Sequence, residues 1–405
     1  MSEGLQVQGP DARSRRATSL LAVILVLLLL LLCGVGYFFV RVLVPAGAPE
    51  TACVSEGMTW VRSIYGFGPS SDEQLLGPTD VAIAPDGRIY ATDPQRARVL
   101  AFNPDGTFAG LVHTGAGGSG RGMLGRPAGI TCDSRGNLYI SDVVNGKILV
   151  FDHDYTFVRE WPAQQALGMR VVDDKLYVRE LGEVVIYTLD GIETARFGER
   201  GRGTGAVLEP TGGITADEKR VYVADALNQA VKVFSADGAL LWSQPSTTAT
   251  GGPTGTDERA AETTSSPVDL PQDVELDSSG QLYALDAFDF SIMRLDNATG
   301  KILGKWGTPG EKDGQFMYPT GLAYDAARDW FAVADTANNR VQIVRVEGTG
   351  GGVGQAVTRA MSSPFRVCAI PLVALLVGIA IILVTRKREE DRDEAGRGSG
   401  SLAAE

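Results

Sequence analysis

An internal repeat constrains this chain more than any other feature of its sequence. Six consecutive segments of the 405 residues follow one pattern: an alternating apolar run, a turn with Asp or Gly, a second run that ends in an acid, an Asx-rich turn, and further short runs. The acids that end the second run are Asp93, Asp142, Glu180, Asp225, Asp286 and Asp335. Period-2 alternation between such turns is typical of antiparallel hairpins. Four strands in a unit of about 40–50 residues indicate the blade of a β-propeller.

The two ends of the repeat predict how the ring closes. The phrase "GKWGTPGEKDGQFMYPTGLAYD" at 304–325 has a degenerate copy at 62–84, "RSIYGFGPSSDEQLLGPTDVAIA". The sixth segment stops after its third run, at Val346, whereas the run 59–65 precedes the first segment and matches the fourth run of the others. A propeller leaves no exposed edge when its N-terminal strand completes the last blade. We therefore predict an all-β, six-bladed β-propeller over 59–347, with the N-terminal strand closing blade six.

The repeat resembles the NHL repeat family. The segment 319–346, "PTGLAYDAARDWFAVADTANNRVQIVRV", carries the Pro-x-Gly opening, the "VAD" and the Asn-Asn-Arg run of that family. The resemblance extends over roughly 60–346. It is looser in the third segment, which lacks the opening proline, and in the fifth, where "DAFDFSIMRL" replaces the Asn-Arg pair. It implies a six-bladed propeller that binds a protein or a small ligand on a face formed by loops.

Two apolar stretches flank the repeat and predict membrane spans. Residues 20–40 and 367–385 carry no charge, and each is long enough to cross a bilayer. Basic residues lie on their outer sides, and the positive-inside bias then places both chain ends in the cytoplasm and the propeller outside the cell membrane. The alternative for the first stretch is a signal peptide cleaved near Ala46-Gly47-Ala48. Its apolar run is longer than a signal core of about 7–15 residues, which favours an uncleaved anchor.

The predicted organisation therefore has seven parts. They are a cytoplasmic segment 1–18, a transmembrane helix 19–41, a linker 42–58, the propeller 59–347, a Gly-rich linker 348–365, a transmembrane helix 366–385 and a charged cytoplasmic tail 386–405. The net charge is −12, and the excess of acids lies between the two spans. Nucleic-acid binding depends on basic surface, so this composition argues against such a partner.

Few residues predict chemistry. The Gly-rich phrases recur as connections between blades, and no helix pattern follows them as a phosphate-binding loop requires. The only two histidines, His113 and His153, are expected in different turns, which disfavours a histidine-based active site. Of the acids of the repeat, Asp142, Asp225, Asp286 and Asp335 are expected to accept backbone N–H groups and fix turns. Trp161, Trp242 and Trp306 are expected to pack between blades.

One irregularity of the repeat is a candidate site. Where the innermost strand of each segment starts, four segments have glycine, but the first has Asp80 and the fifth has Asp273. Both carboxylates are therefore expected at the mouth of the central channel, and converging oxygen ligands suit Ca²⁺. Calcium wants six to eight oxygens, and no further ligand stands out apart from Gln272. The sequence favours no cofactor, with Ca²⁺ at Asp80 and Asp273 as the alternative.

These observations favour a membrane-tethered, extracytoplasmic binding module whose partner is an unidentified protein or small ligand. The alternative is a calcium-dependent, lactonase-like hydrolase or lyase that uses the central channel. The fold alone does not decide between a binding protein and an enzyme.

Overall fold

The computed structural model describes residues 53–114, 117–203, 205–245 and 268–350. The predicted transmembrane helices 19–41 and 366–385 and both predicted cytoplasmic segments lie outside these residues. Among the residues that are described, no helix is both long and apolar enough to cross a membrane.

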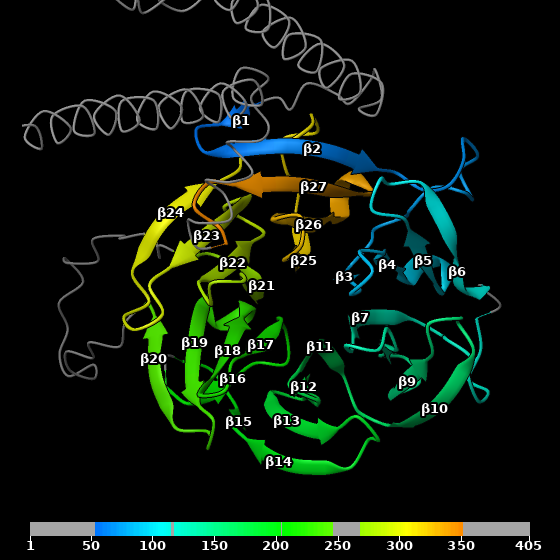
Figure 1. Ribbon diagram of the computed structural model, residues 1–405. Coiled ribbons are helices and arrows are strands. Elements are labelled where there is room, and N and C mark those ends of the chain that lie inside the picture. Colours follow the sequence, from blue (N-terminus) through cyan, green and yellow to red (C-terminus); the bar gives the residue numbers. More distant parts are fainter. Residues whose placement is uncertain (1–52, 115–116, 204, 246–267, 351–405) are drawn as a thin grey trace, which may run out of the picture. The chain divides into compact units, whose positions relative to one another are not determined.

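The described residues form a six-bladed β-propeller. Six antiparallel sheets stand around a central axis, and in each the first strand of the repeat is innermost (Figure 1). Blade one consists of β3 (Val81–Ile83), β4 (Ile89–Asp93), β5 (Arg98–Phe102) and β6 (Phe108–Thr114). Blade two consists of β7 (Pro127–Cys132), β8 (Leu138–Asp142), β9 (Lys147–Phe151) and β10 (Phe157–Pro162). Blade three consists of β11 (Ala166–Val172), β12 (Lys175–Glu180), β13 (Glu183–Thr188) and β14 (Glu193–Phe197).

The second half of the ring repeats this arrangement. Blade four consists of β17 (Ile214–Ala216), β18 (Arg220–Asp225), β19 (Ala230–Ser235) and β20 (Leu240–Gln244). Blade five consists of β21 (Pro271–Leu276), β22 (Leu282–Asp286), β23 (Ser291–Leu295) and β24 (Ile302–Trp306). Blade six contains β25 (Pro319–Asp325), β26 (Trp330–Asp335) and β27 (Arg340–Val346). Short 3-10 turns follow the second strand in three blades: η1 (Pro94–Arg96), η2 (Ala226–Asn228) and η3 (Thr336–Asn338).

The ring closes as the sequence predicts. Strand β2 (Met58–Ile64) pairs antiparallel with β27, the last described strand, and completes blade six (Figure 1). One strand was not predicted. β1 (Cys53–Ser55) pairs with β2 inside the segment that the sequence suggested to be a linker, which makes this sheet five-stranded. A second unpredicted feature is the parallel pair of β15 (Glu199–Arg200) and β16 (Val207–Leu208), in the connection between blades three and four.

The apolar core lies between neighbouring blades. One cluster joins Ile64, Val341 and Ile343 of blade six to Ile89 and Leu100 of blade one, and five similar clusters join the other neighbours. The predicted role of the tryptophans is confirmed in the same clusters. The ring of Trp161, for example, lies 6.4 Å from Tyr139 of its own blade and 6.0 Å from Tyr187 of the next.

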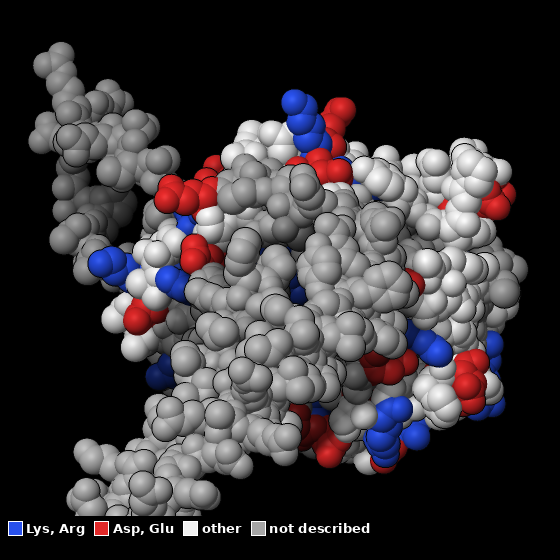
Figure 2. All heavy atoms as spheres, turned by 45° about the horizontal axis from the view of Figure 1, so that its top comes forward, with Lys and Arg blue, Asp and Glu red and all other residues white. Residues whose placement is uncertain are grey.

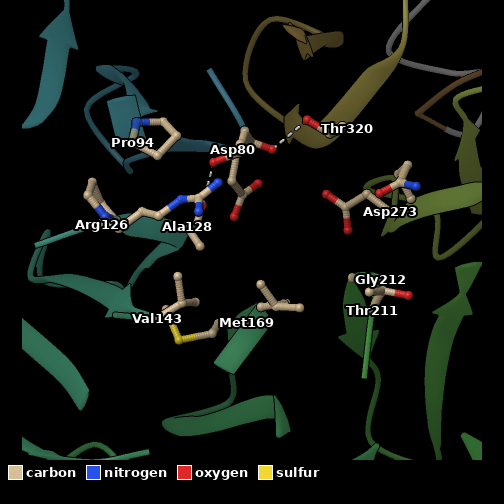
Figure 3. Close-up of a pocket in the computed structure, with 16 residues that line it drawn as sticks. Asp80, Pro94, Arg126, Ala128, Val143, Met169, Thr211, Gly212, Asp273 and Thr320 are labelled. Carbon is tan, nitrogen blue, oxygen red and sulfur yellow. Dashed lines mark hydrogen bonds between the residues drawn. The ribbon is translucent and has the colours of Figure 1, made fainter. Parts of the chain in front are cut away.

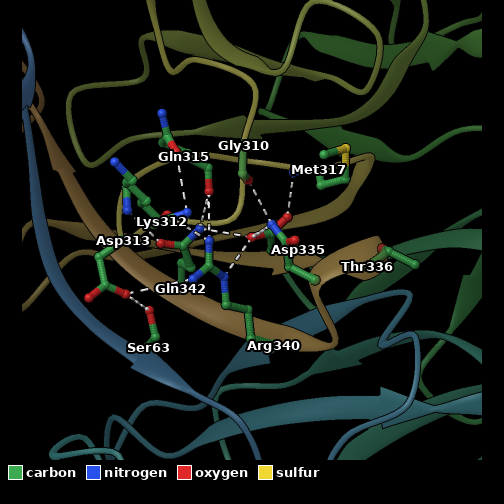
Figure 4. A network of polar contacts seen from close by, with 12 residues as sticks. Ser63, Gly310, Lys312, Asp313, Gln315, Met317, Asp335, Thr336, Arg340 and Gln342 are labelled. Atoms are coloured by element: carbon green, nitrogen blue, oxygen red, sulfur yellow. Dashed lines mark hydrogen bonds and ion pairs between the residues drawn. The ribbon is translucent and has the colours of Figure 1, made fainter.

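In blades two to six, the acid that ends the second strand holds the connection that leads into the blade. Asp335 accepts a hydrogen bond from the backbone N–H of Met317 (2.7 Å), just before β25 starts (Figure 4). Equivalent bonds reach the acids of blades two to five, with these donor and acceptor pairs: Arg126 and Asp142, Gln164 and Glu180, Glu209 and Asp225, Leu270 and Asp286. The predicted structural role of these acids is confirmed. Their main partners belong to the incoming connection as well as to the turn that follows.

Closure of blade six predicts which residues of β2 matter. Ile64 is 3% exposed and packs in the cluster between blades six and one. The substitution Ile64→Ala should lower the free energy of unfolding of the full-length chain by about 2–5 kcal/mol, the usual range for this truncation in a core. The control Thr59→Ala, on the same strand but half-buried, should cost less than about 1 kcal/mol. Equal effects in chemical denaturation would show that β2 does not close the core.

Candidate functional site

A cavity of about 350 Å³ lies where the six innermost strands start. It is open at the mouth of the central channel, and its walls come from the connections between blades and from the turns after the second strands (Figure 3). The lining residues are Thr79, Asp80, Pro94, Arg126, Pro127, Ala128, Val143, Leu167, Gly168, Met169, Thr211, Gly212, Gly213, Gln272, Asp273 and Thr320. Every blade contributes to this list, so the pocket is a product of ring closure.

Glycine lies near the start of four inner strands because neighbouring blades approach closely there. A Cβ atom on Gly168 would lie 2.5 Å from the carbonyl oxygen of Gly212, and one on Gly321 would lie 2.6 Å from the Cα atom of Asp80. Both distances are shorter than a carbon contact allows. The predicted sites Asp80 and Asp273 are the two positions of this ring that carry a side chain, and both face the pocket (Figure 3).

The two carboxylates accept equivalent hydrogen bonds in their blades. Asp80 Oδ2 accepts the backbone N–H of Ile130 in the next blade (2.8 Å), and Asp273 Oδ2 accepts that of Leu322 in the blade after it (2.8 Å). The Oδ1 atom of each accepts the N–H of the residue that follows it. Each acid therefore bridges two inner strands while it also lines the pocket. The sequence predicted the place of these acids but not their bridging role.

An arginine from blade three closes the channel beneath the pocket. Arg170 Nη2 donates to the carbonyl oxygen of Leu322 in blade six (3.0 Å) and forms an ion pair with Glu275 of blade five (2.9 Å). The same atom lies 3.9 Å from Asp273. Because blades three and six lie opposite each other in a six-bladed ring, this side chain spans the bore. Arg170 and Glu275, which we call the floor, lie in the bore next to the pocket but are not among the residues that line it.

Burial and like charges raise the pKa values of the acids around this floor. Burial and the neighbouring Asp273 raise the pKa of Asp80 well above its ordinary range. Burial also raises the pKa of Asp273, to about 7, against the opposing effect of Arg170, and it raises the pKa of Glu275. Although burial lowers the pKa of Arg170, its three acidic neighbours raise it overall, so this guanidinium stays charged. Burial raises the pKa of the nearby Cys132 thiol to about 12.

Several polar groups of the pocket have no partner within the part of the chain that the structure describes. The hydroxyl oxygen of Thr211 is buried there without a hydrogen bond. The side-chain amide of Gln272 and the guanidinium of Arg126 also make no hydrogen bond or ion pair with a described residue, and Arg126 extends from blade two into the pocket in Figure 3. The side chains of Gln272 and Arg126 are therefore available to a bound molecule, whereas the Thr211 hydroxyl oxygen is fully buried in the pocket wall.

Other sequence predictions fare differently. His153 lies in the hairpin after β9, beside Asp154, as predicted. His113, which was expected in a turn, instead belongs to the outer strand β6, because that strand extends further than its alternation suggests.

Arg170 was not identified from the sequence as a residue of the channel. Its only signal is that the third segment alone has a cation at this inner position. The described residues contain no group of three or more His, Cys, Asp or Glu side chains that could hold a metal ion.

Comparison with known proteins supports the fold alone. The sequence matches no protein-family model and no curated protein. A structural genomics protein of unknown function from Bacteroides thetaiotaomicron is similar in structure, with a TM-score of 0.51 and 16% identity over 72% of this chain and 76% of that one. A gluconolactonase from Xanthomonas campestris gives 0.48 and 14% identity over 71% and 89% of the two chains. A streptogramin B lyase gives 0.47 and 13% identity over 71% and 97%.

The raised pKa of Asp273 predicts how stability depends on pH. The folded protein holds this proton up to about pH 7, whereas the ordinary value is 3.8, so stability should fall as pH rises through that window. The total change is expected to be on the order of 1–3 kcal/mol. In Asp273→Asn the fall should become smaller, because one titrating carboxyl is removed from the group with Asp80, Glu275 and Arg170.

Urea unfolding of the full-length chain at several pH values measures this slope. The control is Asp154→Asn. It removes a carboxylate that is 76% exposed and lies in the hairpin between β9 and β10, at the end of blade two away from the pocket. Its slope should equal that of the parent chain. Identical slopes for Asp273→Asn and the parent would show that Asp273 ionises normally in the folded protein.

Proposed function

We propose that this chain is a membrane-tethered, extracytoplasmic propeller of the NHL type that binds a small polar molecule in the pocket at the channel mouth. One observation carries the proposal: every blade lines a single 350 Å³ cavity that contains unpartnered polar groups from three different blades. Its volume is at the small end of the range of about 300–1,000 Å³ for small-molecule sites.

A purely structural role for this cavity explains less. The side-chain amide of Gln272 and the guanidinium of Arg126 line the cavity and make no hydrogen bond or ion pair with a described residue. A bound molecule with matching donors and acceptors would give them partners. The side chain of Arg170, which reaches across the bore to Leu322, also favours a ligand that enters and leaves by the mouth over one that passes through the channel.

The two ends of the described part of the chain lie away from the pocket mouth. Strand β27 runs from Arg340, on the side of the pocket, to Val346 at the other end of the blade, where Met58 of β2 pairs with it. Both ends of the described residues therefore leave the propeller on the face opposite the pocket mouth. The apolar stretches 20–40 and 367–385 and their basic outer flanks support the placement of both termini in the cytoplasm.

The charge of the surface supports a partner other than nucleic acid. On the face in Figure 2, acidic and basic side chains are interspersed over the described residues and form no continuous basic patch there. Together with the net charge of −12, this arrangement lacks the basic surface that a phosphate backbone needs.

A calcium-dependent lactonase-like enzyme is the less favoured alternative. Asp80 and Asp273 face the same cavity, as such a site requires, but Ca²⁺ takes six to eight oxygen ligands. Within the described part of the chain, no group of three or more His, Cys, Asp or Glu side chains could supply them. We propose that the pocket works without a metal.

Two neighbouring valines of one turn test the pocket. Val143 lines the cavity, whereas Val144 is 68% exposed outside it. In a thermal-shift screen of amino acids, monosaccharides, small organic acids and nucleosides, at least one compound should raise the Tm of the full-length chain. That shift should persist in Val144→Trp and disappear in Val143→Trp, because the indole fills the pocket. At a hundredfold excess over Kd the stabilisation is about 2.7 kcal/mol.

The same assay separates the alternatives. A ligand shift that survives Val143→Trp, or the absence of a shift with every compound, would contradict a pocket ligand. Calcium chloride should leave the Tm unchanged. A calcium-dependent shift that is lost when both Asp80 and Asp273 are replaced by asparagine would instead favour the metal-dependent enzyme.

The tether predicts which parts of the chain are accessible from outside. A membrane-impermeant maleimide applied to intact cells should label a cysteine placed at Ser71, which is exposed in the connection before β3, and should not label one placed at Ser401. The parent chain provides the background from its own four cysteines. Labelling of the Ser401 variant alone would reverse the topology, and equal labelling of both would argue against a membrane tether.

A further inference from the structure

The pocket contains charged groups of both signs. In Figure 3 the side chain of Arg126, from blade two, extends towards Asp80 of blade one, and Asp273 of blade five lies beyond Asp80. From this arrangement we infer that the ligand is a zwitterion of the amino-acid type, with its ammonium group at the two carboxylates and its carboxylate at Arg126. The inference deepens the proposed function and rests on it.

The acids at the floor outnumber the cations. Asp80, Asp273 and Glu275 share a single buried cation, Arg170, whose closest carboxylate is Glu275 at 2.9 Å. Asp273 is 3.9 Å from that guanidinium, and Asp80 forms no ion pair among the described residues. A ligand ammonium group placed there stabilises the ionised form of Asp80 and Asp273.

The carboxylates can accept that ammonium group without losing their present bonds. Each of their oxygens accepts one backbone N–H, from Val81 and Ile130 for Asp80 and from Val274 and Leu322 for Asp273. A carboxylate has about four lone-pair sites in all, so each acid retains about two for a ligand. The bonds already made fix the two acids in position before a ligand arrives.

Arg126 supplies the complementary site. Its side chain is exposed, makes no ion pair with a described residue and points into the pocket in Figure 3. A guanidinium binds a carboxylate through two parallel hydrogen bonds, which fixes the orientation of the ligand as well as its charge. Its backbone is also held, because the N–H of Arg126 donates to Asp142.

An apolar wall completes the arrangement. Val143 and Met169 lie across the pocket from the two aspartates in Figure 3, and Leu167 lines the same region. With charges fixed at two points, this wall receives the third substituent of an α-amino acid. An aliphatic or thioether side chain fits it better than a charged one, since burying a charge there is costly.

The pH dependence of binding follows from the same groups. Asp80, Glu275, Arg170, Cys132 and Arg126 are the titratable or charged groups around Asp273. An ammonium ligand pairs with the ionised carboxylate, so its binding should tighten as pH rises from 5.5 to 8, while the ligand itself stays a zwitterion. A neutral ligand has no such reason to bind more tightly.

The experiment is calorimetric titration of the full-length chain with L-leucine, L-methionine and L-phenylalanine, each with its N-acetyl and amide derivatives. At least one free amino acid should bind, and more tightly at pH 8 than at pH 5.5. Its N-acetyl derivative, which lacks the ammonium group, and its amide, which lacks the carboxylate, should each bind at least tenfold more weakly.

Arg126→Gln provides a test that does not depend on the buried acids. It should weaken binding of the free amino acid at least tenfold and leave binding of the amide unchanged, because only the carboxylate contact is lost. The matched control is Arg135→Gln, whose side chain is 67% exposed at the opposite end of blade two, and it should change neither.

The outcomes separate this inference from the proposed function. If an N-acetyl derivative binds as tightly as its parent amino acid, the ammonium site is wrong. If Arg126→Gln weakens binding of the free amino acid and of its amide equally, the carboxylate site is wrong. If no amino acid binds but a sugar, organic acid or nucleoside gives a shift that Val143→Trp abolishes, the pocket binds a ligand and the zwitterion inference is wrong. If no compound binds, both proposals fail.

Discussion

The architecture depends on one interaction that recurs around the ring, the hydrogen bond from an incoming connection to the acid at the end of a second strand. In blade six the N–H of Met317 donates to Asp335, and two residues later β25 starts. The bond fixes where each inner strand begins, and the pocket is lined by the residues at those starts. The scaffold thus positions the candidate site through a contact that is itself outside the site.

These acids are buried, and the blades satisfy them in different ways. Asp335 also accepts bonds from Asn338, Arg340 and Gln342, in the network of Figure 4. Asp225 has a fully buried lysine, Lys232, at 2.8 Å. Asp286 instead accepts only backbone N–H groups among the described contacts, from both sides of the turn. A buried charge is tolerated when it is well bonded, so the acid is retained at this position although its cation varies.

More of the fold than of the candidate site could be predicted from the sequence. The number of blades and the pairing of β2 with β27 followed from one truncated repeat and one orphan run, since both are properties of the pattern itself. Strand β1 did not follow, because three residues are too few to show alternation. Asp80 and Asp273 could be placed at the channel mouth by alignment with glycines. Arg170 could not, because its partners Leu322 and Glu275 belong to other blades and only the closed ring brings them together.

The pocket owes its chemistry to departures from the repeat. Glycine lies near the start of four inner strands, where the backbones of neighbouring blades approach closely. Asp80 and Asp273 at the equivalent positions introduce charge at the mouth, and Arg170 and Glu275 place further charges in the bore beside the pocket. The same symmetry that makes the ring stable makes such substitutions effective, because six equivalent positions converge on one axis. A side chain introduced at such a position in one blade therefore lies near the equivalent positions of the other five. A binding site can then form from residues that are far apart in the sequence.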